Sequence, residues 1–382
     1  MYFDVEYYLR VVRHVWALKS WRGRNRMLFR LLVLVPLTTV FHGICFLLDY
    51  LLFPRLWRQQ VIKPVFIVGH ARSGSTLCHR LMAADGETFS YFLYWETFFP
   101  SLLQKKIIRA LGWVDVNLLG GPIRKRLEVW DEKMFGSSRH IHNMSLWTSE
   151  EDQFVMRAAF VTQQWALDVP MMDKLDLFHL DRMPETRRRR WMHHYRECVK
   201  RQLLLNGGDG THLSKNPMMS GWVDSLIQAF PDARIVVVMR DPAQCIPSVL
   251  KLMQFSWRGR RWKHDDYAAS MRELIRISFD TFRNPRDVLA RHPTTPQVIV
   301  DYRKLTTQPR DTLLAIYAAL GMTVSADFDA YLLAQESRER GHKTPFTYSI
   351  EEFTQDGLSR ERIESELADF YAEFDWPRGE GA

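Results

Sequence analysis

The chain has 382 residues, of which 46% are hydrophobic and 25% charged, and its formal net charge is +8. This length allows a large core in one or two domains, and the composition excludes an intrinsically disordered chain and a protein with many membrane spans. The basic surplus suits a polyanionic ligand or an anionic membrane. We expect no nucleic-acid partner, because no aromatic-basic RNA motif or zinc spacing accompanies the charge. The four Cys are scattered, which favours a reducing compartment over a disulfide framework or a metal site.

Residues 1–58 stand apart from the rest of the sequence. Aromatic and basic residues are frequent in the first 30 positions, and an apolar stretch over 31–52 has nearly the length of a membrane span. Pro36 would kink such a span and Asp49 is costly in hydrocarbon, whereas the basic flank suits the membrane interface. Three interpretations stay open: a monotopic anchor in one leaflet, a transmembrane anchor, and a helix packed on the domain or on a second subunit.

The next segment predicts a strand, a loop of small residues and a helix. Residues 65–68 form an unbroken apolar run, as in a strand buried on both faces, and the run ends at Gly69. The loop Arg72-Ser73-Gly74-Ser75-Thr76 follows, and its N–H groups together with the helix N-terminus suit an anion. The pattern approaches the Walker A loop, but Ser75 stands where that loop has its obligatory Lys. We therefore expect a phosphate cradle that differs from that of a P-loop kinase.

A second apolar run, residues 235–239, ends in Arg240-Asp241-Pro242. Ser248 lies about two helical turns further along the chain. An Arg at the carboxyl end of a strand can bind a phosphate through two N–H groups, and the Ser hydroxyl can add another donor. This segment therefore predicts a second anion site.

Together the two segments resemble the donor-binding motifs of sulfotransferases, in the order in which that family has them. The loop from Arg72 to Thr76 is similar to the family's 5′-phosphosulfate loop, and Arg240 with Ser248 is similar to its 3′-phosphate motif. The resemblance implies an enzyme that moves a sulfuryl group from 3′-phosphoadenosine-5′-phosphosulfate (PAPS) to a hydroxyl or an amine. It implies that Arg72, as a catalytic and donor-binding residue, holds the 5′-phosphate with the N–H groups of residues 73–76, and it requires no metal.

The resemblance also implies catalytic roles outside the two motifs. Glu96 occupies the place of the residue that removes the acceptor's proton in several branches of the family. A carboxylate at the N-terminus of a helix is the alternative interpretation of Glu96, and Glu150 and Glu151 are the other candidates for the base. Lys215 matches the Lys that binds the oxygen bridging sulfate and phosphate and helps it to leave.

Two further positions match residues that the family places near the donor. Tyr302 matches a Tyr on the nucleotide side, although Arg303 replaces the Glu that is common after it. Lys343 matches a basic residue in a C-terminal loop over the phosphates.

Strands that alternate with helices predict an α/β fold, a P-loop-like three-layer domain with a central parallel sheet and its ligand at the carboxyl ends of the strands. We expect an N-terminal helical, membrane-associated segment over 1–58 and a sulfotransferase domain over 59–382, in which 97–205 is a helical insertion on the acceptor side. The alternatives are a kinase-like phosphotransferase and a non-catalytic, membrane-associated nucleotide-binding protein.

The sequence motifs do not specify the acceptor. The N-terminal segment favours a lipid, a glycolipid or a glycan, presented at a membrane surface. We expect the catalytic domain to face the cytoplasm, with the Golgi lumen as the alternative compartment, and a homodimer stays open.

Overall fold

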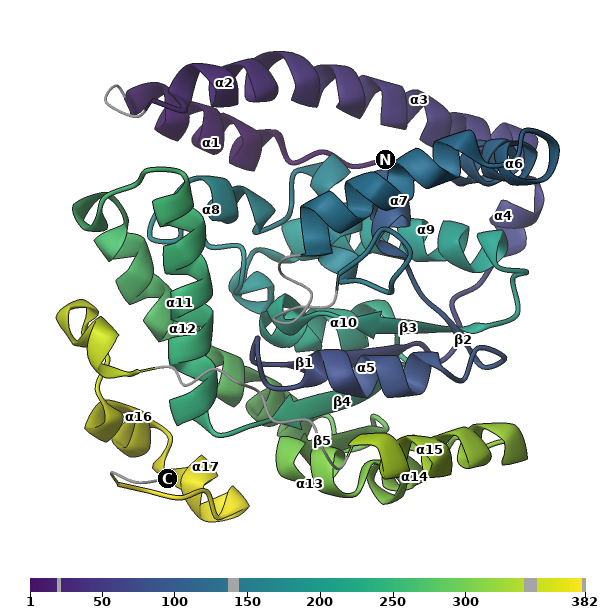
Figure 1. Cartoon of the computed structure of the whole chain (residues 1–382). Helices are drawn as coiled ribbons and strands as arrows, with labels where there is room; N and C mark the ends of the chain where they lie inside the picture. The colour runs from purple at the N-terminus through teal and green to yellow at the C-terminus, as the bar shows by residue number, and fades with distance from the viewer. Residues whose placement is uncertain (19–21, 137–143, 340–348, 380–382) are drawn as a thin grey trace.

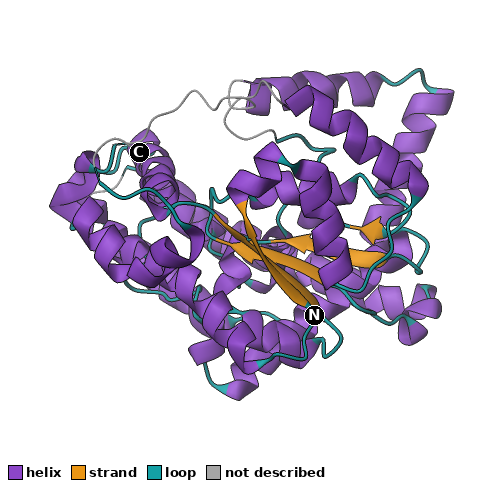
Figure 2. Ribbon diagram, turned by 90° about the horizontal axis from the view of Figure 1, so that it is seen from below, coloured by secondary structure: helices purple, strands orange, loops and turns teal. Residues whose placement is uncertain are grey.

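A five-stranded parallel sheet forms the centre of the computed structural model, which describes residues 1–18, 22–136, 144–339 and 349–379. Neighbouring strands follow the order β2-β3-β1-β4-β5, and every pair is parallel. The strands are β1 (Val65–Gly69), β2 (Phe89–Ser90), β3 (Thr211–Lys215), β4 (Arg234–Met239) and β5 (Gln297–Asp301). Helices lie on both faces of the sheet (Figures 1 and 2), so the predicted three-layer α/β fold is confirmed.

Burial on both faces explains the unbroken apolar run of β1. Val65 and Ile67 belong to one buried cluster, which also contains residues of α14 (Pro309–Ala319) such as Tyr317. Phe66 and Val68 point the other way, into a larger cluster that contains Trp191 of α9 (Glu185–Leu205). Successive side chains of a strand alternate between faces, so a strand between two helical layers needs apolar residues at every position.

The two helical layers come from different parts of the chain. One layer consists of α5 (Ser75–Ala83), α13 (Tyr302–Thr307), α14 (Pro309–Ala319) and α15 (Ala326–Glu339). The other consists of α9 (Glu185–Leu205), α10 (Val223–Ala229), α11 (Pro242–Gly259) and α12 (His264–Arg291), with α16 (Arg360–Glu366) and α17 (Ala368–Phe374) beside α11 and α12.

The chain between β2 and β3 is mostly helical, as expected for residues 97–205. Its helices are α6 (Leu102–Leu118), α7 (Pro122–Phe135), α8 (Gln164–Asp168) and α9, and 3-10 helices cover Tyr94–Phe98, Asp152–Ala159 and Leu180–Arg182. Two more 3-10 helices cover Pro217–Gly221 and Glu351–Asp356. That the insertion serves the acceptor stays a prediction.

The N-terminal helices lie along one side of the molecule, coloured purple in Figure 1. They are α1 (Val5–Ala17), α2 (Arg24–Phe29), α3 (Val35–Leu52) and α4 (Arg55–Arg58), and a π-helical turn over Arg30–Leu34 joins α2 to α3 without a break. Residues 24–52 are the one helix among the described residues that is long and apolar enough to cross a membrane.

This N-terminal segment shares the core of the rest of the chain. Tyr7, Val11 and Val15 of α1 are buried in the same cluster as Phe66 and Val68 of β1. The hydroxyl of Tyr7 also donates a hydrogen bond to the carbonyl oxygen of residue 176. The division at residues 58 and 59 stays a prediction, and the two parts on either side of it pack together.

Candidate active site

The loop after β1 lies at the carboxyl edge of the sheet, between the ends of β3 and β4. Gly69 ends β1 with φ +133°, and a Cβ there would lie 2.3 Å from the carbonyl oxygen of Val238 in β4. Arg72 and Gly74 take positive φ values of 73° and 96°, and Gly74 caps α5. This turn directs the N–H groups of the first turn of α5, which have no acceptor within the helix, toward the edge of the sheet.

The ring of Tyr302 connects the two predicted phosphate motifs. A Cβ on Gly74 would lie 2.2 Å from Cδ2 of Tyr302, so the ring rests directly on the loop. The guanidinium of Arg240 lies over the same ring, 4.6 Å from its centre. Gly74 and Arg240 are therefore on the same side of the sheet, as one ligand that spans both motifs requires.

Hydrogen bonds join the motifs directly as well. Nε of Arg72 donates to Oγ of Ser248 at 3.1 Å, and Nη1 of Arg240 donates to the carbonyl oxygen of Arg72 at 3.4 Å. Asp241 caps α11 by accepting a hydrogen bond from the N–H of Ala243, which is the ordinary role of Asp at this position. The strand end, the cap and the loop together hold Arg240 and Ser248 beside Arg72.

Two cations in this arrangement lack an anionic partner. Neither Arg72 nor Arg240 forms an ion pair with a carboxylate of the described residues, and the side chains bind the neutral groups of Ser248 and Gln244 instead. Oγ of Ser73 is fully buried and makes no hydrogen bond within the part of the chain that the structure describes. Two guanidinium groups, a buried hydroxyl and a helix N-terminus form a binding site for an anion with separate charged groups.

Lys215 ends β3 in register with Ile67 of β1, at the same edge of the sheet. Its side chain is 1% exposed, and Nζ lies 3.0 Å from Oε1 of Glu151 and 3.5 Å from Oε1 of Glu150. Burial lowers the pKa of Lys215, but the two carboxylates outweigh burial and raise that pKa above its usual value. Burial raises the pKa of Glu150, and the charge of Lys215 offsets this only in part.

Glu96 lies in a closed set of hydrogen bonds. Its side chain is fully buried and accepts from the N–H of Leu93 at 3.0 Å, from Nη2 of Arg109 at 2.7 Å and from Nε2 of Gln202 at 2.8 Å. The bond to the N–H of Leu93 is the cap of the 3-10 helix that contains Glu96. These three contacts hold parts of the fold together, and the role of Glu96 as a base stays a prediction.

The sequence alone did not suggest His79 and Ser149 as neighbours of Lys215. Nδ1 of His79 lies 3.2 Å from Oγ of Ser149. Burial and then the charge of Lys215 lower the pKa of His79 to about 3. The available signal was the position of His79 on α5, one turn after Thr76 of the loop.

The structure thus brings together most of the residues that the sequence predicted to be functional. Arg72, Ser73, Gly74, Ser75, Thr76, Arg240, Ser248 and Tyr302 form one group around the loop, and Lys215 ends the adjoining strand. Lys343 lies outside the described residues. Arg303, which departs from the family pattern, forms an ion pair with Asp301 at 2.6 Å.

Solved structures with the same fold include two mycobacterial sulfotransferases. STF9 from Mycobacterium avium superposes with a TM-score of 0.74 at 16% identity, over 98% of this chain and 93% of that chain. STF1 from Mycobacterium tuberculosis superposes with a TM-score of 0.66 at 17% identity, over 95% of this chain and 92% of that chain.

A curated relative by sequence is the omega-hydroxy-beta-dihydromenaquinone-9 sulfotransferase Stf3 of Mycobacterium bovis and of Mycobacterium tuberculosis. It is 23% identical over 352 residues, with 83% of this chain and 81% of the relative covered. A model of the sulfotransferase family matches residues 64–326, which hold both phosphate motifs, Glu96 and Lys215. The chain belongs to the sulfotransferase family and is an enzyme of that class.

Proposed function

We propose that this sulfotransferase transfers a sulfuryl group from PAPS to a hydroxyl group of a membrane lipid. The observation that carries the choice of donor is the pair Arg72 and Arg240. These two guanidinium groups lack carboxylate partners among the described residues. Arg72 bonds to Ser248, and Arg240 lies over the ring of Tyr302 that rests on Gly74. A donor with one phosphate at each end of a nucleoside would give each guanidinium an anionic partner.

The residues of the loop and of α11 would hold the donor at its two ends. Arg72 and the N–H groups of Ser75 and Thr76 would bind the 5′ end, and Oγ of the buried Ser73 would find there the partner it lacks. Arg240 and Ser248 would bind the 3′-phosphate. The ring of Tyr302, between Gly74 and Arg240, would position the nucleoside.

Lys215 would neutralise the charge that develops on the leaving phosphate. Sulfuryl transfer, like phosphoryl transfer, depends on in-line placement and charge neutralisation more than on covalent help from the protein. The two neighbouring carboxylates raise the pKa of Lys215 by more than burial lowers it. The raised pKa keeps the ammonium group protonated for this task.

A carboxylate would take the proton of the acceptor hydroxyl while the new oxygen–sulfur bond forms and the bond from sulfur to the leaving phosphate breaks. Glu96 is the candidate from the family resemblance. Contact with Lys215 favours Glu151, whose side chain keeps 18% of its surface exposed, and Glu150 beside it.

The lipid acceptor is inferred from two observations. The name of the curated relative describes sulfation of a hydroxylated menaquinone, and residues 24–52 form a long apolar helix on this protein. Glycolipids and glycans are the other acceptors that the sequence suggested. We propose that the enzyme works at the cytoplasmic face of a membrane. Its free cysteines, all four of them buried, suit that compartment.

The experiment that tests this function is a transfer assay with the full-length protein in detergent micelles. We expect ³⁵S from labelled PAPS to reach an omega-hydroxylated isoprenoid quinone, and no label to move from γ-³²P ATP. The Lys215→Met variant should lose at least about 100-fold in kcat. Transfer to a soluble sugar in preference to the quinone would overturn the lipid assignment, and phosphate transfer from ATP would overturn the donor.

A further inference from the structure

The helix of residues 24–52 and the α6–α7 hairpin pack together and present large apolar side chains to the outside. Helix α3 packs against α6, and α6 packs against α7, as Figure 1 shows at the upper right of the molecule. Leu37, Ile44 and Leu51 of α3 are 63%, 55% and 72% exposed. Leu111 of α6 and Val129 of α7 are 62% and 71% exposed. Monomeric soluble proteins rarely expose contiguous apolar surface on this scale.

We infer that this surface, which we call the lipid face, rests in the plane of one leaflet of an anionic membrane, and that α3 does not cross the bilayer. The inference deepens the proposed function, because it rests on the proposal that the acceptor is a membrane lipid. It adds the α6–α7 hairpin to the membrane contact and excludes a single transmembrane anchor.

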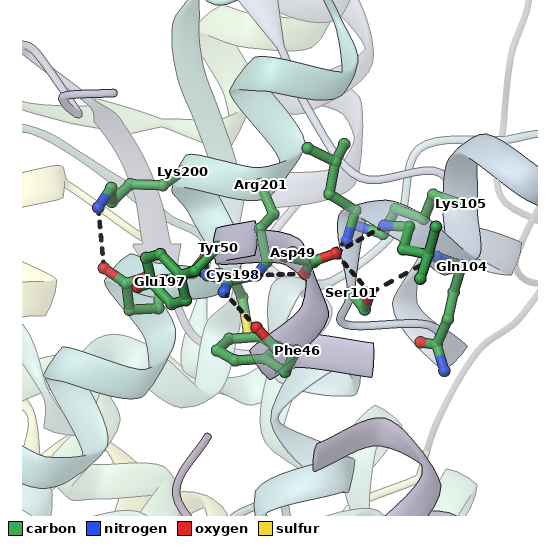
Figure 3. Close-up of polar contacts among 12 residues, drawn as sticks. Phe46, Asp49, Tyr50, Ser101, Gln104, Lys105, Glu197, Cys198, Lys200 and Arg201 are labelled. Atoms are coloured by element: carbon green, nitrogen blue, oxygen red, sulfur yellow. Dashed lines mark hydrogen bonds and ion pairs between the residues drawn. The ribbon is translucent and has the colours of Figure 1, made fainter. Parts of the chain in front are cut away.

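A buried acid on the inner side of α3 fixes the helix to the catalytic domain (Figure 3). Asp49 is fully buried and accepts four hydrogen bonds, from Oγ of Ser101 at 2.8 Å, the N–H of Leu102 at 3.0 Å, the N–H of Leu103 at 2.8 Å and Nε of Arg201 at 2.7 Å. Asp49 therefore caps the N-terminus of α6 and pairs with a cation of α9 at the same time.

Arg201 completes this cluster and is itself fully buried. Its Nη1 donates to Oε2 of Glu197 at 2.8 Å, its Nη2 donates to the carbonyl oxygen of Phe46 at 3.1 Å, and its guanidinium stacks 3.4 Å above the ring of Phe46. Pulling α3 away to span a bilayer would place Asp49 in hydrocarbon and leave the buried Arg201 without one of its two carboxylate partners. Either change costs several kcal/mol.

The charges of the lipid face complement an anionic leaflet. Residues 22–58 carry six Arg and a single acidic residue, Asp49. Residues 102–135 carry seven Lys or Arg and four acidic residues. The two segments together account for the chain's whole surplus of eight positive charges. A basic, apolar surface of this kind binds headgroups through its cations while its side chains enter the acyl boundary. A second copy of the chain would instead place these two positive surfaces against each other.

Depth measurements on labelled protein test the inference. Because the four native cysteines are buried, an environment-sensitive fluorophore can be placed at Leu37→Cys, Ile44→Cys, Leu51→Cys, Leu111→Cys or Leu333→Cys, one at a time. Leu333 on α15 is a matched control, because it is 59% exposed and lies in the opposite helical layer. The full-length proteins are mixed with vesicles of phosphatidylcholine with phosphatidylglycerol, and doxyl-labelled lipids measure the depth of each label.

An in-plane seat predicts equal, shallow depths for the three labels on α3 and for the label at position 111, and no quenching at position 333. A transmembrane helix would place the label at 44 about 10 Å deeper than the labels at 37 and 51, because seven helical residues separate each pair. That result, or quenching on α3 without quenching at position 111, would overturn the inference. A dimer that light scattering detects without lipid, and in which the fluorescence of all four labels is shielded from water, would also overturn the inference.

Variants that add a negative charge to the lipid face separate this inference from the proposed function. Leu111→Asp and Val129→Asp should reduce binding to the anionic vesicles at least 10-fold, and Leu333→Asp should not. Turnover of a short-chain, detergent-soluble acceptor should stay within about 2-fold in all three variants, because none of these residues touches the donor site. Vesicle binding by the unsubstituted protein that all three variants retain would therefore contradict only the membrane contact. Absence of sulfuryl transfer by the unsubstituted protein would contradict the proposed function.

Discussion

Arg72 and Ser248 are joined by a hydrogen bond of 3.1 Å, although 176 residues separate them in the chain. Arg72 belongs to the loop between β1 and α5, and Ser248 belongs to α11, which follows β4. Since β1 and β4 are neighbours in the sheet, this contact makes a single site of two segments that are far apart in sequence.

Replacing Gly74 should damage donor binding more than stability. Gly74→Ala introduces a Cβ 2.2 Å from the ring of Tyr302, at a φ of +96° that costs Ala about 1 kcal/mol. We expect the affinity for 3′,5′-ADP, measured by calorimetry, to fall at least about 10-fold. Gly86→Ala is the control, because no atom lies within 4 Å of the added Cβ. Equal affinities for the two variants would contradict the placement of the donor on this loop.

Replacing Arg240 should remove the preference for a 3′-phosphate. Arg240→Ala loses a charge-assisted bond of about 1.5–3 kcal/mol, so we expect 3′,5′-ADP to bind about 10–100-fold more weakly and 5′-AMP to bind almost as before. Lys304→Ala on the adjoining α13 removes one exposed positive charge and serves as the control. A uniform loss for both nucleotides would show that Arg240 does not discriminate the 3′ end.

Two carboxamide variants identify the base. If Glu151 takes the acceptor's proton, Glu151→Gln should lower kcat by at least about 100-fold with little change in the KM for PAPS. Glu96→Gln should then mainly lower the free energy of unfolding, because it removes the charge of a buried carboxylate that pairs with Arg109. The measurements are steady-state kinetics together with urea unfolding of each variant. A loss of kcat in Glu96→Gln at unchanged stability would return the base to Glu96.

Acid should destabilise the protein through His79. The pKa of this buried side chain is lowered to about 3 from an ordinary value of 6.5. The folded form therefore stays neutral while the unfolded chain takes up a proton, so the stability is complete above pH 6.5 and falls as the pH drops toward 3. We expect His79→Gln to reduce this fall by about 1 kcal/mol per pH unit between pH 6 and 5. Urea unfolding at several pH values measures the slope.

Removing Asp49 should destabilise the whole fold. Asp49→Ala leaves the buried Arg201 without its closest carboxylate and uncaps α6, and breaking a buried pair of this kind costs about 3–5 kcal/mol. Glu128→Ala breaks a surface pair with Arg124, whose side chains are about half exposed, and should cost less than about 1 kcal/mol. Similar unfolding free energies for the two variants would show that the buried cluster does not hold α3 in place.

The sequence was informative where function needs contiguous residues. A phosphate loop between a strand and a helix is local, so the apolar run of β1, the loop from Arg72 and the positive φ of Gly74 belong to one short stretch. The strand before Arg240 and the cap at Asp241 are local in the same way. The three-layer α/β fold followed from the alternation of such units and is confirmed by the structure.

Contacts made across long stretches of chain were not predictable. Glu150 and Glu151 reach Lys215 because Ser149 forms an antiparallel bridge with Leu93 and the N–H of Glu150 donates to the carbonyl oxygen of residue 92. Nothing in the spacing of these residues signals that pairing. The same applies to Glu96, whose partners Arg109 and Gln202 come from two different helices.

The cluster around Asp49 also decides how a soluble form of this enzyme can be obtained. Cutting the chain after residue 58 would remove the cap of α6, the partner of Arg201 and the core residues Tyr7, Val11 and Val15. A shortened polypeptide should therefore aggregate instead of crystallising. Polar replacements on the outward side of α3, at Leu37, Ile44 and Leu51, leave every one of those contacts intact and are the better route to a detergent-free preparation.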